Sequence, residues 1–365
     1  MGKSFKETER SRSYLRGIMK DIFQGLITNR AVKEHIGFDI AKGRASHAYI
    51  IEGPAGSGKH TIARMIASAL SCLNSDNDAY PLPCGVCDNC RKIRDNNSGD
   101  VVYVNKEDKA SIGVDAVRSI REGLYVMPND SDYRTYIIEE ADKMTPAAQN
   151  AFLLSLEEPP SFVVFLLLTE DRQKLLETIR SRAQIVRTES IKRDDMREYL
   201  LSTAVGKTLS LRSPDEIDRI ISMSGGVIGK ALMLMSDNEE SSAYKRAREI
   251  AESLVSHICK GKKADALRGI LEAKITSAAE AKEILILAAN SVRDMIAVKK
   301  NSADELLFYV TADEALVASA DAPMKKLMLL NDEIYASVLK IEANVSYKNV
   351  ISELIMKTSH IRRSV

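Results

Sequence analysis

The chain has 365 residues, which is enough for two or three domains with a substantial core. Its 52 lysine and arginine residues nearly cancel its 51 aspartate and glutamate residues, and aromatic residues are few, which excludes a strong overall attraction to nucleic acid and argues against a base-stacking platform. There is no signal-peptide core and no run near the roughly 18 apolar residues of a membrane span, so we expect a cytoplasmic protein without membrane contact.

The clearest motif is the stretch from His47 to Thr61, HAYIIEGPAGSGKHT, which follows an expected helix at residues 22–42. A short apolar run, a glycine-rich loop and a helical pattern occur here in the order of a phosphate-binding loop, whose backbone N–H groups attract phosphate. The alternative is a chance glycine-rich turn, and the flanking strand and helix argue against it. The predicted nucleotide-binding residues are Gly53, Pro54, Gly56, Ser57, Gly58, Lys59, His60 and Thr61.

One position departs from the phosphate-loop motif, which ends in Gly-Lys-Ser or Gly-Lys-Thr. Here His60 follows Lys59. The missing hydroxyl ordinarily binds Mg²⁺, a cation that prefers oxygen to imidazole nitrogen. Thr61 lies one residue later, about 100° around the helix, and cannot take its place. The loop can therefore still hold a nucleotide such as ATP with Mg²⁺, but His60 argues against metal-assisted hydrolysis.

Four of the five cysteines cluster after this helix, in the stretch CLNSDNDAYPLPCGVCDNC. Four thiolates suit a structural Zn²⁺ ion with tetrahedral coordination, and the prolines and glycine between them bend the chain. A disulfide pair or reactive thiols is the alternative, which a cytosolic setting disfavours. The fifth cysteine, Cys259, is expected to be a small buried apolar residue. The predicted metal ligands are Cys72, Cys84, Cys87 and Cys90.

Strand and helix patterns alternate as far as residue 187. Besides the strand at residues 48–51, strands are expected at residues 100–105, 135–138, 162–168 and 183–187, and helices at residues 114–124, 146–158 and 172–181. Thr145 and Pro146 are a typical N-cap and first helical residue. This alternation predicts an α/β fold with a five-stranded parallel sheet covered on both faces and a site at the carboxyl ends of the strands.

Polar residues close the third and fourth of these strands. Glu139 occupies the position where nucleotide-hydrolysing proteins hold Mg²⁺ with aspartate, and Glu140 matches the carboxylate that polarises the attacking water. Glu139 is one methylene longer than aspartate, so a metal would be held differently. Without the phosphate loop, both carboxylates would be read as a solvated turn. Thr169 is placed to sense a γ-phosphate.

Arg182 follows the expected helix at residues 172–181, near the edge of the sheet. In oligomeric ATPases an arginine here can reach the γ-phosphate of a neighbouring subunit, where its guanidinium group stabilises the transition state. A solvent-facing residue without a role is the alternative, and spacing alone does not decide between the two.

After about residue 189 the strand patterns stop. Ser213 begins a capping box whose helix ends at Gly225 and Gly226, and a shorter helix is expected at residues 229–235. From residue 239 to the end the patterns are helical, with apolar stripes typical of core or subunit contacts. The two clearest stripes comprise Ile284, Leu287, Ala288, Val292, Met295 and Ile296, and Leu327, Leu330, Ile334, Val338 and Ile341.

Five stretches together carry a family signature: HAYIIEGPAGSGK, the four-cysteine insert, YIIEEADKMTPAAQNAFLLSLEEPP, LTEDRQKLLETIRSRA and the late EANVSYKN. They resemble the AAA+ clamp-loader subunits of bacterial DNA polymerase III, and the delta prime branch more than the gamma/tau motors. The resemblance is dense over residues 22–235 and loose beyond.

The resemblance implies an AAA+ P-loop core at residues 1–188, with a zinc module at about residues 72–90. A helical lid at residues 189–238 and an all-α collar domain at residues 239–365 would follow. It also implies a hetero-pentamer with gamma/tau and delta subunits, which loads the sliding clamp onto primed DNA.

The match to the family's motifs is uneven. His60 and Glu139 depart from the family's hydroxyl residue and aspartate, and Gly229 stands where the motors have a lid arginine, with Lys230 beside it. Arg182 keeps the arginine of the Ser-Arg-Cys motif. The resemblance therefore favours a delta prime-like subunit with little ATPase activity of its own, which lends Arg182 as a finger in trans.

Two alternatives stand beside this hypothesis. The first is an active gamma/tau-like motor, against which His60, Glu139 and the absent lid arginine argue. The second is an AAA+ DNA-processing ATPase outside replication, such as a branch-migration motor, against which the cysteine insert and the stretch NAFLLSLEEPP argue.

Overall fold

The computed structural model describes residues 22–359, except for residues 28, 31, 78, 107–108, 213, 237 and 303–305. The chain forms two compact units, Met1–Ile191 and Lys192–Val365. The predicted collar and all but the first three residues of the predicted lid, 189–191, fall within the second unit, and the division between them stays a prediction. In the part of the chain described, no helix is both long and apolar enough to cross a membrane.

The first unit is built on a five-stranded parallel sheet, as the sequence predicts, and the structure gives the strand order β2-β3-β4-β1-β5. The strands are β1 (Ala48–Glu52), β2 (Val101–Val104), β3 (Arg134–Ile138), β4 (Val163–Thr169) and β5 (Gln184–Arg187). All seven residues of β4 are buried, which explains its continuous apolar sequence. Glu52 pairs with Thr169, so β1 and β4 end at the same edge.

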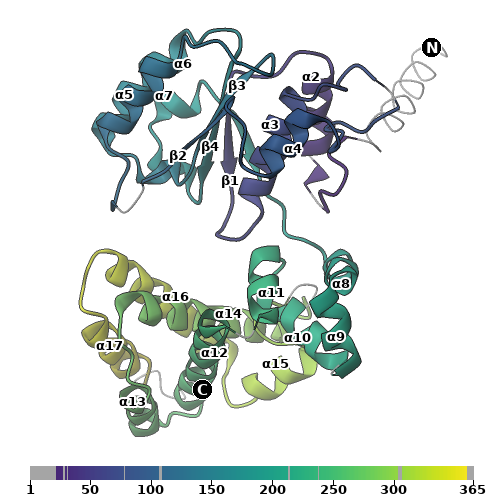
Figure 1. Ribbon diagram of the computed structural model, residues 1–365. Helices are drawn as coiled ribbons and strands as arrows, with labels where there is room; N and C mark the ends of the chain where they lie inside the picture. Colours follow the sequence, from purple (N-terminus) through teal and green to yellow (C-terminus); the bar gives the residue numbers. More distant parts are fainter. Residues whose placement is uncertain are drawn as a thin grey trace, which may run out of the picture. The chain divides into compact units, whose positions relative to one another are not determined.

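Helices cover both faces of this sheet (Figure 1). On one face, Tyr49 and Ile51 pack with residues of α3 (Lys59–Leu70) and α4 (Asp88–Arg94). On the other face, Ala48 and Ile50 pack in a core with residues of α5 (Val114–Gly123), α6 (Pro146–Glu157) and α7 (Glu177–Arg180). Because side chains alternate along β1, one strand serves both halves of the core.

Two predicted helices are only partly present. Among the described residues between 22 and 42, the named helical elements are the π-helical turn η1 (Val32–Gly37) and the short α2 (Phe38–Ala41). Gly25 and Asn29 have left-handed backbones with φ of 92° and 68°, which a right-handed helix cannot contain. Ile22 instead forms a bridge with Leu82.

The predicted helix at residues 172–181 is also interrupted. It consists of the 3₁₀ turn η3 (Arg172–Lys174) and α7, separated by Leu175 and Leu176 in extended conformation. The buried side chain of Gln149 accepts a hydrogen bond from Leu176 N and donates one to Lys174 O. These tertiary bonds replace the local ones that a continuous helix would make.

The second unit is helical throughout the residues described. Its helices are α8 (Arg193–Ser202), α9 (Ala204–Arg212), α10 (Pro214–Ser224), α11 (Ile228–Met235), α12 (Glu239–Cys259), α13 (Lys263–Glu272), α14 (Ala278–Lys299), α15 (Ala312–Ser319), α16 (Met324–Glu342) and α17 (Tyr347–Ser359). Helix α14 packs against α12 and α16. Both predicted apolar stripes are largely buried, apart from half-buried Ile296 and Val338. The predicted cap Ser213 lies outside the described residues.

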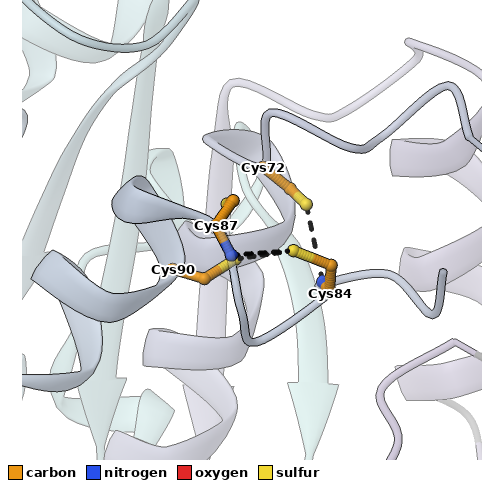
Figure 2. A group of neighbouring side chains, drawn as sticks. All are labelled: Cys72, Cys84, Cys87 and Cys90. Atoms are coloured by element: carbon orange, nitrogen blue, oxygen red, sulfur yellow. Dashed lines mark hydrogen bonds between the residues drawn. The ribbon is translucent and has the colours of Figure 1, made fainter.

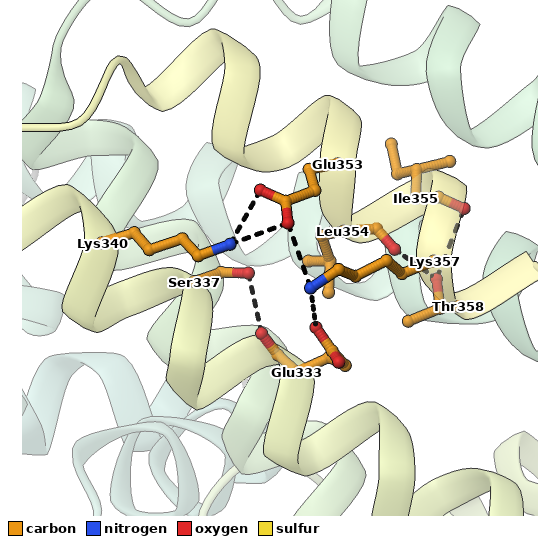
Figure 3. Close-up of polar contacts among 8 residues, drawn as sticks. All are labelled: Glu333, Ser337, Lys340, Glu353, Leu354, Ile355, Lys357 and Thr358. Carbon is orange, nitrogen blue, oxygen red and sulfur yellow. Dashed lines mark hydrogen bonds and ion pairs between the residues drawn. The ribbon is translucent and has the colours of Figure 1, made fainter.

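Helix α17 is joined to α16 by charged side chains as well as by apolar packing (Figure 3). Lys340 Nζ lies 2.8 Å from Glu353 Oε2, and Lys357 Nζ lies 3.0 Å from Glu353 Oε1 and 3.3 Å from Glu333 Oε2. Since these side chains are partly exposed, the pairs contribute little to stability. Burial of Leu354 and Ile355 supplies the main attraction.

Candidate functional site

The loop between β1 and α3 has the backbone of a phosphate cradle. Gly56 and Gly58 have φ of 75° and 89°, in the left-handed region that favours glycine. A Cβ atom on Gly53 would lie 1.9 Å from Thr188 Oγ1 and 2.7 Å from Ser57 Oγ, so a larger residue does not fit there. Gly58 caps α3 without a side-chain hydrogen bond, which leaves the first N–H groups of the helix available to an anion.

Lys59 lies across this loop. Its Nζ donates hydrogen bonds to Gly53 O at 2.5 Å and to Pro54 O at 2.8 Å, and the residue is 8% exposed. Burial lowers the pKa of the Lys59 amino group, while the carboxylates of Glu170 and Asp142 act in the opposite direction. The amino group would have to exchange its carbonyl partners for phosphate oxygens to bind a nucleotide.

The two residues that depart from the magnesium-binding pattern contact each other. His60 Nδ1 lies 3.2 Å from Glu139 Oε1, with 56% of the His60 side chain exposed and 25% of that of Glu139. His60 comes from the first turn of α3, and Glu139 directly follows β3. An imidazole and a carboxylate in contact thus stand where a hydroxyl and an aspartate would together hold Mg²⁺.

The other predicted residues at this edge also have partners within the chain. Glu140 has a left-handed backbone with φ of 48°, and its carboxylate pairs with Lys106 Nζ at 3.0 Å. Thr169 is buried, and its Oγ1 donates to Asp142 Oδ1 at 3.2 Å. We did not single out Lys106 or Asp142 from the sequence, although each closely follows an expected strand.

The residues present fit phosphate better than they fit Mg²⁺. Ser57 Oγ is buried without a hydrogen-bond partner, which is a donor that a phosphate oxygen would satisfy. Lys59 and the α3 N-terminus supply positive charge beside it. Thr61 is exposed at the start of α3, and His60 supplies no hydroxyl oxygen. Ser57, Lys59 and the α3 N-terminus therefore suit the phosphates of a nucleotide. The hydroxyl ligand that usually binds the accompanying Mg²⁺ is replaced by the imidazole of His60.

The four clustered cysteines converge as predicted (Figure 2). Their sulfur atoms all lie within 4.8 Å of one another, and Cys84 Sγ is 3.9 Å from Cys90 Sγ. Four sulfurs around a tetrahedral Zn²⁺, each about 2.3 Å from the ion, would be about 3.8 Å apart. All four cysteines are free, so the arrangement suits a metal ion rather than a disulfide.

Backbone hydrogen bonds to two of the sulfur atoms favour their thiolate form, which is the form that binds a cation. Cys84 N donates to Cys72 Sγ at 3.4 Å, and Cys87 N donates to Cys84 Sγ at 3.3 Å. Burial raises the pKa of Cys72 and Cys90. Burial acts in the same direction on Cys84, but hydrogen bonds from the backbone N–H groups of Val86 and Cys87 outweigh it and lower the pKa of Cys84 to about 6. A thiolate at Cys84 is thus stabilised before any metal binds.

Arg182 lies beyond α7 and is held by two contacts. Its Nη1 donates to Thr178 O at 3.0 Å, and its Nη2 pairs with Glu157 Oε1 at 3.2 Å. The side chain is 37% exposed, so part of the guanidinium group faces solvent. The ion pair joins residues 25 positions apart, and no spacing in the sequence indicates it.

Comparisons with known proteins address the segment that carries these sites. Residues 28–192 match the family described as DNA polymerase III, delta subunit. The gamma/tau subunit of DNA polymerase III from Mycobacterium bovis is 35% identical over 160 residues, which are 44% of this chain and 27% of that protein. This segment belongs to the clamp-loader family of DNA polymerase III subunits. Both the phosphate loop and the cysteine cluster lie in the clamp-loader segment, as does Arg182.

Other relatives extend the match within the clamp-loader family. The gamma/tau subunit from Mycoplasma pneumoniae is 28% identical over 223 residues, 61% of this chain and 32% of that protein. The chain thus spans no more than about a third of either curated relative. A solved structure of a gamma subunit-related protein from Thermotoga maritima is 17% identical, and the match covers 88% of this chain and 96% of that chain with a TM-score of 0.43.

Proposed function

We propose that this chain is a clamp-loader subunit of DNA polymerase III with a delta prime-like role. It joins gamma/tau and delta subunits in a hetero-pentamer that loads the sliding clamp onto primed DNA. Its AAA+ core at residues 1–188 cleaves little or no ATP and presents Arg182 to the nucleotide of a neighbouring subunit. The lid at residues 189–238 and the collar at residues 239–365 serve assembly.

The observation that carries this proposal is the contact between His60 and Glu139, 3.2 Å apart. Mg²⁺ binds oxygen ligands in a strict octahedral geometry, and imidazole nitrogen is a poor substitute. Because hydrolysis needs the metal to bridge the β- and γ-phosphates, a loop with this pair retains nucleotide without an efficient metal position. Lys59, Ser57 and the α3 N-terminus would hold the phosphates.

The surroundings of Lys230 support the same conclusion. This residue stands beside Gly229, where the motor subunits have an arginine in the lid. Its Nζ lies 4.3 Å from the centroid of the Tyr244 ring, and burial lowers its pKa. Lys230 is thus engaged inside the second unit and does not replace the arginine.

The cysteine cluster has a separate role in this proposal. Cys72, Cys84, Cys87 and Cys90 would hold a structural Zn²⁺ ion, with all four coordination positions filled by protein. With no position left for water or substrate, the ion would stabilise the fold between α3 and α4 without taking part in catalysis.

ATP turnover tests the proposal. We expect the isolated chain to hydrolyse ATP well below about 1 s⁻¹, a low rate for an enzyme. In a reconstituted complex with gamma/tau and delta, Arg182→Ala should lower turnover at least about tenfold, since an arginine finger can contribute 10³-fold or more. Arg94→Ala, which removes an exposed arginine from α4, is the matched control and should leave turnover unchanged.

An active gamma/tau-like ATPase is the second candidate, because the curated relatives reported above carry that name. It requires turnover above about 1 s⁻¹ by the isolated chain, abolished by Lys59→Ala. That result would refute the delta prime-like role. Failure of the chain to join any clamp-loader complex would refute both candidates.

A further inference from the structure

The last residue of α6, Glu157, contacts the proposed arginine finger within the same chain. Glu157 Oε1 lies 3.2 Å from Arg182 Nη2, and Arg182 Nη1 is bound to Thr178 O. The two contacts use one N–H of each terminal nitrogen of the guanidinium group. The remaining N–H groups, including that of Nε, stay available to an oxyanion.

Helix α6 is a rigid base for this contact. Thr145 caps the helix by accepting a hydrogen bond from Ala148 N, and Phe152 and Leu156 are fully buried. Gln149 of the same helix donates a hydrogen bond to Lys174 O and accepts one from Leu176 N, which fixes the segment that leads into α7. The helix therefore holds the finger segment at two places, once through its backbone and once through the arginine itself.

We propose that Glu157 is a positioning residue for Arg182. The inference rests on the proposed role of Arg182 in trans. An unrestrained arginine samples many rotamers, and the carboxylate restricts Arg182 to those that keep its guanidinium group beside Glu157 and partly exposed to solvent. Because the side chains are 37% and 49% exposed, the pair is weak enough to adjust when a γ-phosphate arrives.

The opposite role would be a contact that sequesters the finger. A carboxylate beside a guanidinium group also reduces its attraction for phosphate, so removal of Glu157 would then raise turnover. The direction of the effect distinguishes positioning from sequestration. Glu157→Gln separates charge from geometry, since its amide oxygen still accepts the hydrogen bond from Nη2.

The experiment is ATP turnover by a reconstituted complex of this chain with gamma/tau and delta. We expect Glu157→Ala to lower kcat about two- to fivefold, the population change that loss of an exposed ion pair produces, with KM for ATP unchanged. Glu157→Gln should restore most of the rate. Glu158→Ala is the control, because Glu158 is exposed at the next position and forms no ion pair among the described residues.

A double variant gives the readout that a purely structural role would not produce. In a chain that already carries Arg182→Ala, Glu157→Ala should have no further effect, and thermal unfolding should show that both variants remain folded. A rate that is unchanged or raised by Glu157→Ala alone overturns the inference. So does a further loss, by the same factor as in the otherwise wild-type chain, when Glu157→Ala is added to Arg182→Ala. If Arg182→Ala itself has no effect, the finger role fails and the inference fails with it.

Discussion

Helix α3 connects two sites of opposite character. Lys59 begins the helix at the phosphate loop, and Cys72 follows its end at the cysteine cluster. In the cluster, four sulfur atoms converge, and those of Cys72 and Cys84 accept backbone N–H hydrogen bonds, an arrangement that suits a cation. In the loop, two of the polar side chains have partners within the chain instead: Lys59 donates to the carbonyls of Gly53 and Pro54, and His60 contacts Glu139.

This difference separates two roles within the first unit: stabilisation of the fold at the cysteine cluster and nucleotide binding at the phosphate loop. The cluster links the end of α3, the loop at Cys84 and the start of α4, so loss of a single ligand should lower the stability of this part of the first unit. The loop is supported by the sheet and by α3 whether or not a nucleotide binds. Substitutions that remove the Mg²⁺ ligands at the N-terminus of α3 can therefore leave the cysteine cluster at its C-terminus, and the fold that it stabilises, intact.

The largest expected effect comes from the cluster. Cys84→Ser should abolish metal binding and lower the free energy of unfolding by about 2.7 kcal/mol, the stabilisation by a metal present at a hundred times its Kd. Metal analysis and urea unfolding measure the two effects. Cys259→Ala, at a buried cysteine of α12, should keep the metal. Full metal content in Cys84→Ser would show that Cys84 is not a required ligand, so the cluster would not differ from the phosphate loop in the way proposed.

The next effect is a gain at the loop. Changing His60→Thr and Glu139→Asp together restores the oxygen ligands, and we expect about tenfold tighter binding of ATP in Mg²⁺, equal to about 1.4 kcal/mol. Titration with a fluorescent nucleotide, with Mg²⁺ or with a chelator, measures it. The gain should disappear in chelator. An equal gain under both conditions would mean that His60 and Glu139 do not limit metal binding.

A smaller effect tests whether stability and ligand binding are separable. Thr145→Ala removes the N-cap of α6 and should lower the free energy of unfolding by about 1 kcal/mol, with metal content and nucleotide affinity unchanged. Thr145→Ser keeps the hydroxyl and should retain most of the stability. Metal loss in Thr145→Ala would show that general destabilisation, rather than loss of a ligand, explains the result at Cys84.

The smallest effect comes from a charge network within the second unit. A hydrogen bond from Arg197, with the charges of Arg197 and Arg193, lowers the pKa of Asp218. Its stabilisation is complete above the unfolded-chain pKa of about 3.9 and is lost as the pH falls through the lower folded-state value. Asp218→Asn should therefore cost less than about 1 kcal/mol at pH 7, and less still in acid.

Unfolding by urea at several pH values measures this difference against wild type. Asp332, which is exposed in the middle of α16 and forms no ion pair among the described residues, provides the control variant Asp332→Asn, which should be neutral at every pH. A difference for Asp218→Asn that grows as the pH falls would mean that its carboxylate is not stabilised in the folded state.

Much of the first unit was predictable because its signals are local. The apolar run of β4, the glycines of the phosphate loop and the Thr145-Pro146 cap each specify backbone conformation over a few residues. The convergence of the cysteines was also predictable, since four soft ligands in so short a stretch are typical of a metal site.

The interruption between η3 and α7 was not predictable in the same way. Leu175 and Leu176 fit a helical pattern, and only the amide of Gln149 on α6 draws their backbone away from it. A hydrogen bond between distant segments outweighs a local preference of a few tenths of a kcal/mol per residue.

The sequence by itself determined which chemical groups each site contains: the glycines, Lys59, the four thiols, and an imidazole where a hydroxyl is usual. Only the tertiary structure decided which of these groups face a ligand and which face each other. His60 meets Glu139, and Arg182 meets Glu157, because the sheet and α6 bring distant segments within hydrogen-bond reach. Side-chain pairing of this kind depends on the packing of the whole unit, which no local pattern encodes.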